Sequence, residues 1–193
     1  MPNIVHNRLE ILGEKNEVKS VREFLKKKKP DEIEGDIIDF NNIIKMPECL
    51  NIESNAGSTY PHGVLLSKSP GYDFLITGEE NGNDLEAEKE AIKLAESNFE
   101  KTGFYNWYDW RNANWETKWN ASSQNLDGDN IIYFDTAWNP VVKLIKILSQ
   151  RFPKIEFRYT FDILGEYVTG KMIIQDGEIV KSKLKEWDLN IFR

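Results

Sequence analysis

The chain has 193 residues and a mass of 22.5 kDa, a size typical of one large domain or of a small domain with an insertion. Hydrophobic residues make up 40% and charged residues 30%, so the chain can bury a core and is not disordered as a whole. A formal charge of −7 argues against a dedicated duplex-DNA binder, whose affinity comes mainly from neutralised phosphates.

The amino-acid usage excludes several further classes of protein. No apolar run approaches the roughly 18 residues that span a bilayer, and the first residues lack the basic and apolar stretches of a secretion signal. A single cysteine, Cys49, forms no disulfide framework and fits a reducing compartment, so we expect a cytoplasmic protein. Two histidines and one cysteine leave little material for a zinc site, and we expect neither a metal nor a cofactor.

Charge is distributed unevenly along the chain. Residues 1–30 carry eight basic and four acidic side chains, residues 31–135 carry seven and twenty-one, and residues 136–193 carry ten and seven. An acidic middle between two mildly basic ends predicts that the middle is a separate structural unit.

The N-terminal part predicts a strand, a helix and a short strand. Apolar side chains alternate over Ile4–Leu12, and helical spacing follows over Lys15–Lys28. The lysines of Lys26–Lys29 complement the negative end of that helix, and Pro30 ends it. A short strand is predicted at Ile37–Phe40. The lysine run fits a solvated helix end better than a phosphate contact.

The C-terminal part repeats the same order of elements. Ile131–Thr136 predicts a buried strand, and Asn139 followed by Pro140 predicts the start of a helix capped by the asparagine. An apolar stripe follows at helical spacing, formed by Val141, Leu144, Ile145, Leu148 and Phe152. Residues 155–162 alternate apolar and polar side chains, which predicts a strand with one buried and one solvated face.

These patterns predict an α+β fold, a ferredoxin-like split β-α-β sandwich with an antiparallel sheet and two helices on one face. We expect residues 1–193 to form a single domain, with 42–128 as a large, acidic, partly helical insertion. Within the insertion, Asn83 predicts the cap of a helix that ends near Gly103, and a short strand is predicted at 72–77. Asp176-Gly177 predicts the type I′ turn of a C-terminal β-hairpin that extends the sheet or folds over its edge.

Tryptophans are concentrated in and just after the second half of the insertion. Four lie within 107–119 and a fifth follows at the end of the predicted strand 131–136. Two interpretations are open: the indoles seat the insertion on the sheet, with Asn114, Asn120 and Asp135 accepting their N–H groups, or they form an exposed binding surface. The candidate binding residues are Trp107, Trp110, Trp115, Trp119, Asn120 and Trp138.

Catalytic and metal-binding patterns are weak. Neither a dinucleotide-binding glycine motif nor a P-loop is present, and the acidic stretches at 79–84 and 127–130 do not have the spacing of an EF-hand. Cys49 and His62 could meet Asp135 or Glu116 only through the fold, whereas His6 on a strand reads as a structural histidine. We therefore assign no catalytic residue and expect the protein not to be an enzyme.

Four stretches resemble a known family when they are taken together. They are Met1–Gly13, Asp39–Glu48, Asn114–Ala121 and Phe134–Pro140, and the most specific elements are NW-x-TKWNA and F-x-TAW-x-P. Their order is similar to that of phage- and plasmid-encoded proteins with a ferredoxin-like domain, the YubB-like group. That group carries glycine at the position of Glu116. The resemblance implies the ferredoxin-like fold and a mobile-element origin, and it implies no activity.

Three hypotheses about function remain. The leading one is a soluble, non-enzymatic accessory protein of a mobile element that binds an unknown protein through a Trp-rich surface, with selectivity from the acidic insertion. The second is a module that binds single-stranded nucleic acid on a ferredoxin-like sheet, although the basic-aromatic pattern of RNA-binding sheets is missing and nucleic acid is not expected. The third is an enzyme with a cleft between sheet and insertion. The sequence does not give the oligomeric state.

Overall fold

A computed structural model of the chain describes residues 3–26, 37–51, 85–163 and 168–186. The chain forms two compact units, which we call the sheet unit and the helical unit. The sheet unit comprises Met1–Lys45 and Asn114–Arg193, and the helical unit comprises Met46–Ala113. The basic N-terminal and C-terminal parts of the chain therefore meet in one unit.

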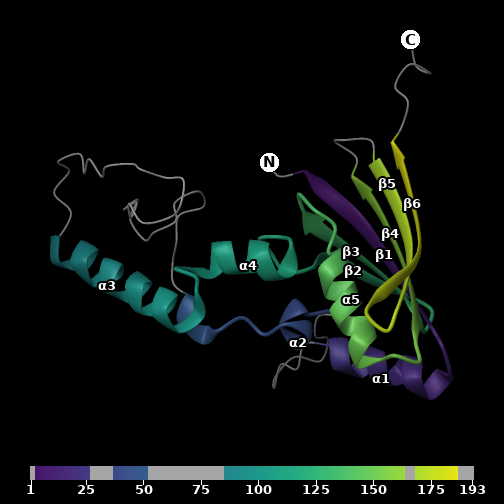
Figure 1. The fold of residues 1–193 in the computed structure, drawn as a ribbon. Coiled ribbons are helices and arrows are strands. Elements are labelled where there is room, and N and C mark those ends of the chain that lie inside the picture. Colours follow the sequence, from purple (N-terminus) through teal and green to yellow (C-terminus); the bar gives the residue numbers. More distant parts are fainter. Residues whose placement is uncertain (1–2, 27–36, 52–84, 164–167, 187–193) are drawn as a thin grey trace, which may run out of the picture. The chain divides into compact units, whose positions relative to one another are not determined.

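The sheet unit is built on six antiparallel strands in the order β2-β3-β1-β4-β5-β6 (Figure 1). The strands are β1 (Ile4–Leu12), β2 (Ser122–Asp127), β3 (Ile131–Ala137), β4 (Glu156–Ile163), β5 (Val168–Gln175) and β6 (Glu178–Glu186). The N-terminal strand β1 lies between β3 and β4 and is paired with both of them. This confirms the predicted α+β fold with an antiparallel sheet.

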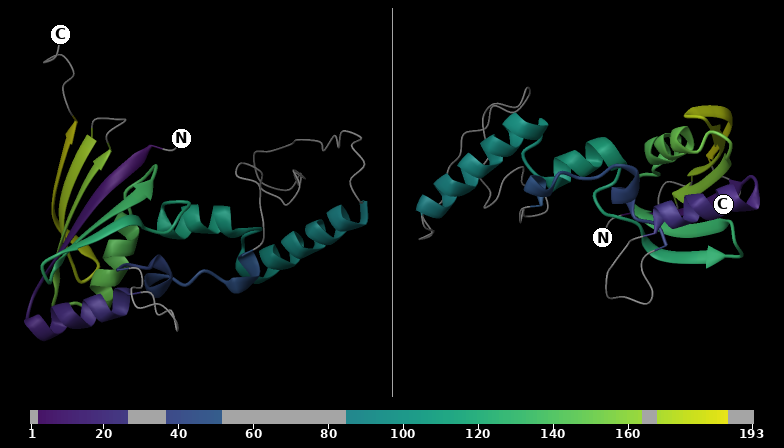
Figure 2. Two further views of the ribbon diagram at one scale, coloured as in Figure 1. Left: turned by 180° about the vertical axis from the view of Figure 1, so that it is seen from behind. Right: turned by 90° about the horizontal axis from the view of Figure 1, so that it is seen from below.

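Helices α1 (Lys15–Leu25) and α5 (Val142–Arg151) cover one face of the sheet. They lie side by side (Figure 2), and Phe24 meets Phe152 edge to face with 5.6 Å between ring centroids. The sheet face toward the helices is apolar because alternate strand residues point to it. The fully buried side chains there include Leu9, Ile11, Ile132, Phe157 and Tyr159.

The short strand predicted at Ile37–Phe40 is wrong. Residues 37–39 carry no regular structure, and α2 (Phe40–Ile43) begins where the strand was expected to end. The second strand of the split β-α-β fold is β2 instead, from a segment whose mostly polar residues gave no strand signal. Ile38 and Phe40 are still fully buried, which explains why the apolar pattern resembled a strand.

Gln124 joins the segment around Ile38 to β2. Its side-chain amide accepts from Ile38 N at 2.8 Å and donates to Ile38 O at 3.1 Å, as a neighbouring peptide group would. Ser123, which precedes it, has φ 48°, and the pairing of β2 with β3 shifts register between Ser122 and Asn125. A side chain therefore replaces strand pairing at this edge of the sheet.

The predicted asparagine cap of α5 is also wrong, whereas the predicted hairpin is confirmed. The helix starts at Val142, and no side chain of the preceding residue caps it. In the hairpin, Asp176 and Gly177 have φ of 47° and 79°, as a type I′ turn requires, and β6 extends the sheet.

The helical unit contains η1 (Glu48–Leu50), α3 (Leu85–Thr102) and most of α4 (Trp107–Trp115). The predicted helix is confirmed by α3, and Gly103 ends it with φ 76° and an N–H bond to Phe99 O at 2.8 Å. Asn106 caps α4 by accepting from Tyr108 N and Asp109 N at 2.8 and 3.1 Å. Asn83 and the predicted strand at 72–77 lie outside the described residues.

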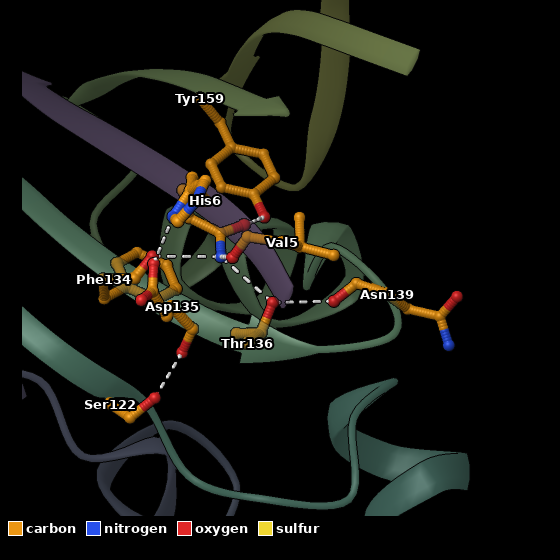
Figure 3. Close-up of polar contacts among 9 residues, drawn as sticks. Val5, His6, Ser122, Phe134, Asp135, Thr136, Asn139 and Tyr159 are labelled. Atoms are coloured by element: carbon orange, nitrogen blue, oxygen red, sulfur yellow. Dashed lines mark hydrogen bonds and ion pairs between the residues drawn. The ribbon is translucent and has the colours of Figure 1, made fainter. Parts of the chain in front are cut away.

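A buried polar network joins the three central strands (Figure 3). The side chain of Asn7, on β1, donates to Val5 O, Phe134 O and Thr136 Oγ1 at 2.9, 3.2 and 3.0 Å. Its carbonyl oxygen accepts from the hydroxyl of Tyr159 at 2.5 Å. That hydroxyl accepts in turn from Val141 N at 2.9 Å, just before α5. Burial raises the pKa of Tyr159 far above its usual range, so the hydroxyl keeps the proton that it donates.

We predict that Tyr159→Phe lowers the free energy of unfolding by about 1–3 kcal/mol, because the carbonyl oxygen of Asn7 and the amide of Val141 lose a buried partner. Urea denaturation followed by far-UV circular dichroism measures the change. Tyr133→Phe is the control, because Tyr133 is 37% exposed and should change stability by no more than about 0.5 kcal/mol. Equal stability of the two variants would contradict the importance of the network.

Candidate functional site

The five candidate tryptophans fall into three environments. Trp107 and Trp110 belong to the helical unit, where Trp107 is half-buried and Trp110 is buried. Trp115 is fully buried in the sheet unit. Trp119 and Trp138, also in the sheet unit, are 45% and 46% exposed. Burial therefore differs among the five tryptophans, and Trp119 and Trp138 leave the largest part of the indole exposed.

Trp115 is a core residue. Its indole N–H donates to Ile44 O at 3.0 Å, and its ring meets Phe40 edge to face with 5.8 Å between centroids. Two of the three predicted acceptors bond other groups: Asn120 bonds Asp39 and the amide of Phe40, and Asp135 bonds a histidine described below. The indole therefore relies on a backbone carbonyl, which no side-chain pattern could reveal.

Asn120 is a structural residue of the same junction. Its amide donates to Asp39 Oδ1 at 2.7 Å, and its carbonyl oxygen accepts from Phe40 N at 3.0 Å and Ala121 N at 2.9 Å. These contacts consume both polar atoms of the side chain in holding α2 against the segment before β2. Asn120 therefore fixes the backbone next to Trp119 and is itself occupied by contacts within the fold.

The two most specific motifs in the sequence meet at the end of β3. The hydroxyl of Thr117 donates to Ala137 O at 2.9 Å and accepts from Ala137 N at 3.2 Å, and both residues are buried. The carboxylate of Glu116 accepts from Lys143 N at 2.8 Å, so it caps the first turn of α5 from outside the helix. These residues of the two motifs serve packing and capping.

Glu116 makes this contact from a left-handed backbone with φ 66°, a conformation that favours glycine. Glycine would adopt this backbone conformation without strain. We predict that Glu116→Ala lowers the free energy of unfolding by about 0.5–2 kcal/mol through loss of the cap. Glu116→Gly should be more stable than Glu116→Ala by about 1 kcal/mol, because only glycine relieves the backbone. Thermal denaturation measures both variants, and equal stability would contradict the role of the backbone.

Trp119 and Trp138 lie at the same end of the sheet. Trp119 lies in the segment between Thr117, which bonds Ala137, and Ser122, which pairs with Asp135. Trp138 follows Ala137 directly, and its backbone N–H donates to Asn3 O at 2.8 Å.

Ile4, which pairs with Ala137, is 38% exposed. We call the three exposed apolar side chains Ile4, Trp119 and Trp138 the tryptophan patch. Lys118 Nζ lies 4.1 Å from the centroid of the Trp119 ring, a cation–π contact that orients the indole.

Trp138 has φ 72°, which is an outlier for a bulky side chain. Left-handed backbone costs a non-glycine residue roughly 1–2 kcal/mol, and such strain persists where the surrounding structure imposes it. The exposed half of the indole contributes no hydrophobic free energy to the stability of this fold. A tryptophan that is both strained and exposed points to a use outside the fold.

A polar row beside the patch was not foreseen. On the sheet face opposite the helices, His6 Nδ1 lies 2.7 Å from Asp135 Oδ1 (Figure 3), and Asp162 faces His6 from β4. Asp162 accepts from the hydroxyl of Thr169 at 2.5 Å. The residues come from strands 129 positions apart, so only the pairing register could have revealed the contact.

The His6–Asp135 pair has the arrangement of a base held by an acid, the half of a catalytic triad that lacks a nucleophile. Ser122 donates to the backbone carbonyl of Asp135 instead, at 3.4 Å. Within the described residues, no hydroxyl or thiol bonds the imidazole, and no cluster of three or more His, Cys, Asp or Glu side chains could hold a metal ion. Among the described residues, the row thus consists of a histidine–aspartate pair with no nucleophile bonded to it.

The enzyme hypothesis required Cys49 or His62 near Asp135 or Glu116. His62 lies outside the described residues, and Cys49 belongs to the helical unit, whereas Asp135 and Glu116 belong to the sheet unit. Asp135 bonds His6 and Glu116 bonds the amide of Lys143. Both carboxylates thus already have partners in the sheet unit.

Comparison with known proteins supports the fold. Residues 114–191 match the family model of the ferredoxin-like domain in Api92-like protein. The C-terminal part of this chain is similar to that domain. The crystal structure of a protein api92 from Yersinia pseudotuberculosis is 13% identical in sequence, with a TM-score of 0.50, and the alignment covers 97% of this chain and 99% of that chain. At this identity the likeness concerns the fold alone.

No curated protein matches the sequence. In the described part of the chain, no helix is long and apolar enough to cross a membrane. Neither observation assigns an activity.

Proposed function

We propose that the protein is a non-enzymatic binding module that docks on another protein through the tryptophan patch. The observation that carries the proposal is the exposure of Trp119 and Trp138, at 45% and 46%, on a unit that buries Trp115 completely. Tryptophan is the residue type most enriched at interface hot spots, where a partner pocket desolvates the indole. A partner with an apolar pocket and a carbonyl acceptor for the indole N–H fits this patch.

The position of the patch favours a rigid docking site. Trp138 follows a strand in the middle of the sheet unit, and its backbone is bonded to Asn3. Trp119 follows Thr117, which is bonded to both backbone groups of Ala137, and precedes Asn120, whose polar atoms are satisfied. Side chains held on such a scaffold lose little entropy on binding, which favours affinity.

We extend the proposal to the kind of genetic element that encodes the protein and to the compartment in which it acts. The resemblance to phage- and plasmid-encoded proteins supports an accessory protein of a mobile element that acts in the cytoplasm. The acidic middle of the chain, which carries twenty-one acidic and seven basic residues over 31–135, would repel acidic partners and so contribute selectivity.

Photo-crosslinking in the expressing host tests the tryptophan patch directly. Benzoylphenylalanine placed at position 119 or 138 should capture the same protein, whereas the probe at position 154 should not. The side chain of Lys154 is 81% exposed in the turn between α5 and β4, away from the tryptophan patch, and serves as the control. Identical adducts from all three positions, or none from 119 and 138, would overturn the proposal.

We further predict that Trp138→Gly separates binding from stability. Glycine relieves the left-handed backbone by roughly 1–2 kcal/mol, which offsets much of the lost contact, so the free energy of unfolding should change by less than about 2 kcal/mol. Trp115→Ala, a truncation of a fully buried indole, should cost about 3–5 kcal/mol. Crosslinking from position 119 should decrease at least tenfold in Trp138→Gly. Loss of stability equal to that of Trp115→Ala would assign Trp138 to the core instead.

Single-stranded nucleic acid is the second candidate ligand, and the lysines of β5 and β6 favour it. Arg158 and Thr160 point to the open sheet face, as the sequence alternation predicts. Among the described strands, however, Tyr133 is the one aromatic residue on that face, so few bases could stack there. Quenching of intrinsic fluorescence by an oligothymidine at low salt measures such binding.

A further inference from the structure

Strand β6 forms an outer edge of the sheet (Figure 1) and is nine residues long. Its inner edge pairs with β5, and no strand in the described part of the chain pairs with its outer edge. Such an edge presents a row of backbone N–H and C=O groups that can pair with another chain. The side chains of β6 determine which chain could do so.

One face of β6 is lined by lysines. In the pairing register, Lys181 lies opposite Ile173, Lys183 opposite Lys171, and Lys185 opposite Thr169. These residues therefore share the open face of the sheet, where Thr169, Lys171, Lys183 and Lys185 line a shallow pocket of about 290 Å³. Like charges directly opposite each other are destabilising. Four lysines thus gather on this face: Lys171, Lys181, Lys183 and Lys185. None of them forms an ion pair with another described residue.

Apolar side chains of β6 are also exposed, and the face opposite the lysines carries Ser182 as well as Leu184. Val180 is 66% exposed and Leu184 is 61% exposed, and Leu184 lies opposite Gly170 on the face that carries the helices. The pairing with β5 shifts between Ile173 and Ile174, so a bulge leaves Val180 without a direct partner. Beyond the bulge the strand is regular from Lys181 to Glu186, with lysines on one face and Ser182 and Leu184 on the other.

The two edges of the sheet differ. At β2, the register shift after Ser122 and the side chain of Gln124 occupy the edge, because Gln124 bonds the backbone of Ile38 on both sides. At β6, the regular segment after the bulge has no such cover among the described residues. Lysines alone can protect an edge against pairing, but that function does not require Leu184 and Val180 to stay exposed beside them.

We propose that the outer edge of β6 binds an extended segment of another protein in which acidic and apolar side chains alternate, so that the segment adds a strand to the sheet. Successive residues on one face of a strand are about 6.6–6.8 Å apart, so acidic side chains at alternate positions meet Lys181, Lys183 and Lys185 in register. The apolar side chains between them cover Leu184 on the other face. A second copy of this chain does not fit, because antiparallel pairing of two β6 strands places lysines against lysines.

A synthetic peptide with the sequence Val-Glu-Val-Glu-Val-Glu-Val tests the proposal with the full-length protein. Fluorescence anisotropy of the labelled peptide should show saturable binding that weakens as salt rises, since the lysine contacts are exposed to solvent. A peptide of the same composition with the sequence Glu-Glu-Glu-Val-Val-Val-Val should bind at least tenfold more weakly. Equal affinity for the two peptides would reduce the contact to general charge attraction and would overturn the proposal.

Charge reversal provides the matched variant. K181E/K183E/K185E should lose at least tenfold in affinity for the acidic peptide and gain binding to Val-Lys-Val-Lys-Val-Lys-Val. K15E/K19E/K154E makes the same change in net charge away from β6 and should bind the acidic peptide as the wild type does. Circular dichroism confirms that both variants are folded, and the switch in peptide preference cannot result from misfolding. Failure of the switch would contradict the proposal.

Amide hydrogen exchange distinguishes strand addition from binding to the lysine face alone. Addition of the acidic peptide should slow exchange at backbone amides between Lys181 and Glu186, because the new strand bonds the outer edge. If an oligothymidine binds in preference to the peptide and leaves those amides unprotected, the lysines contact phosphates and the proposal is wrong. If neither probe binds, the lysines only protect the edge, which also refutes it.

Discussion

The sheet unit depends on β1 entering between β3 and β4. Those two strands are separated in sequence by α5, and each pairs with the N-terminal strand instead of with the other. Asn7 makes this placement specific, because its amide and carbonyl are satisfied only when β3 supplies Thr136 and β4 supplies Tyr159. A buried amide without these partners would cost about 1–3 kcal/mol, so other registers are disfavoured.

The position of β1 also shows that the region similar to the domain of Api92-like protein does not contain the whole sheet. The matched region, 114–191, contains β2 to β6 but lacks β1, the strand that joins β3 to β4. The matched region alone would therefore leave two strand edges open in the middle of the sheet. Residues from both the N-terminal and the C-terminal part of the chain therefore form the ferredoxin-like layer, and the helical unit lies between these parts in sequence.

Much of the sheet unit could be predicted from the sequence, and the failures have identifiable causes. Alternation over β1, β3 and β4, and Asp176-Gly177 in the hairpin, are local signals that the fold preserves. β2 was missed because an edge strand of Ser, Gln, Asn and Asp has no alternating apolar face, and Gln124 replaces a strand partner. At the candidate site, no local pattern separated buried Trp115 from exposed Trp119, since exposure depends on contacts from Phe40 and Ile44. The His6–Asp135 pair depends on register across 129 residues.

The most direct test of the central claim is the state of the Tyr159 hydroxyl in the folded protein, measured by nuclear magnetic resonance with labelled tyrosine. The structure predicts a slowly exchanging hydroxyl proton with nuclear Overhauser effects to the side-chain amide of Asn7 and the backbone amide of Val141. Because burial raises its pKa, this tyrosine should remain protonated at a pH at which free tyrosine ionises. A Tyr159 hydroxyl that exchanges rapidly and ionises as free tyrosine does would contradict the placement of β1 between β3 and β4.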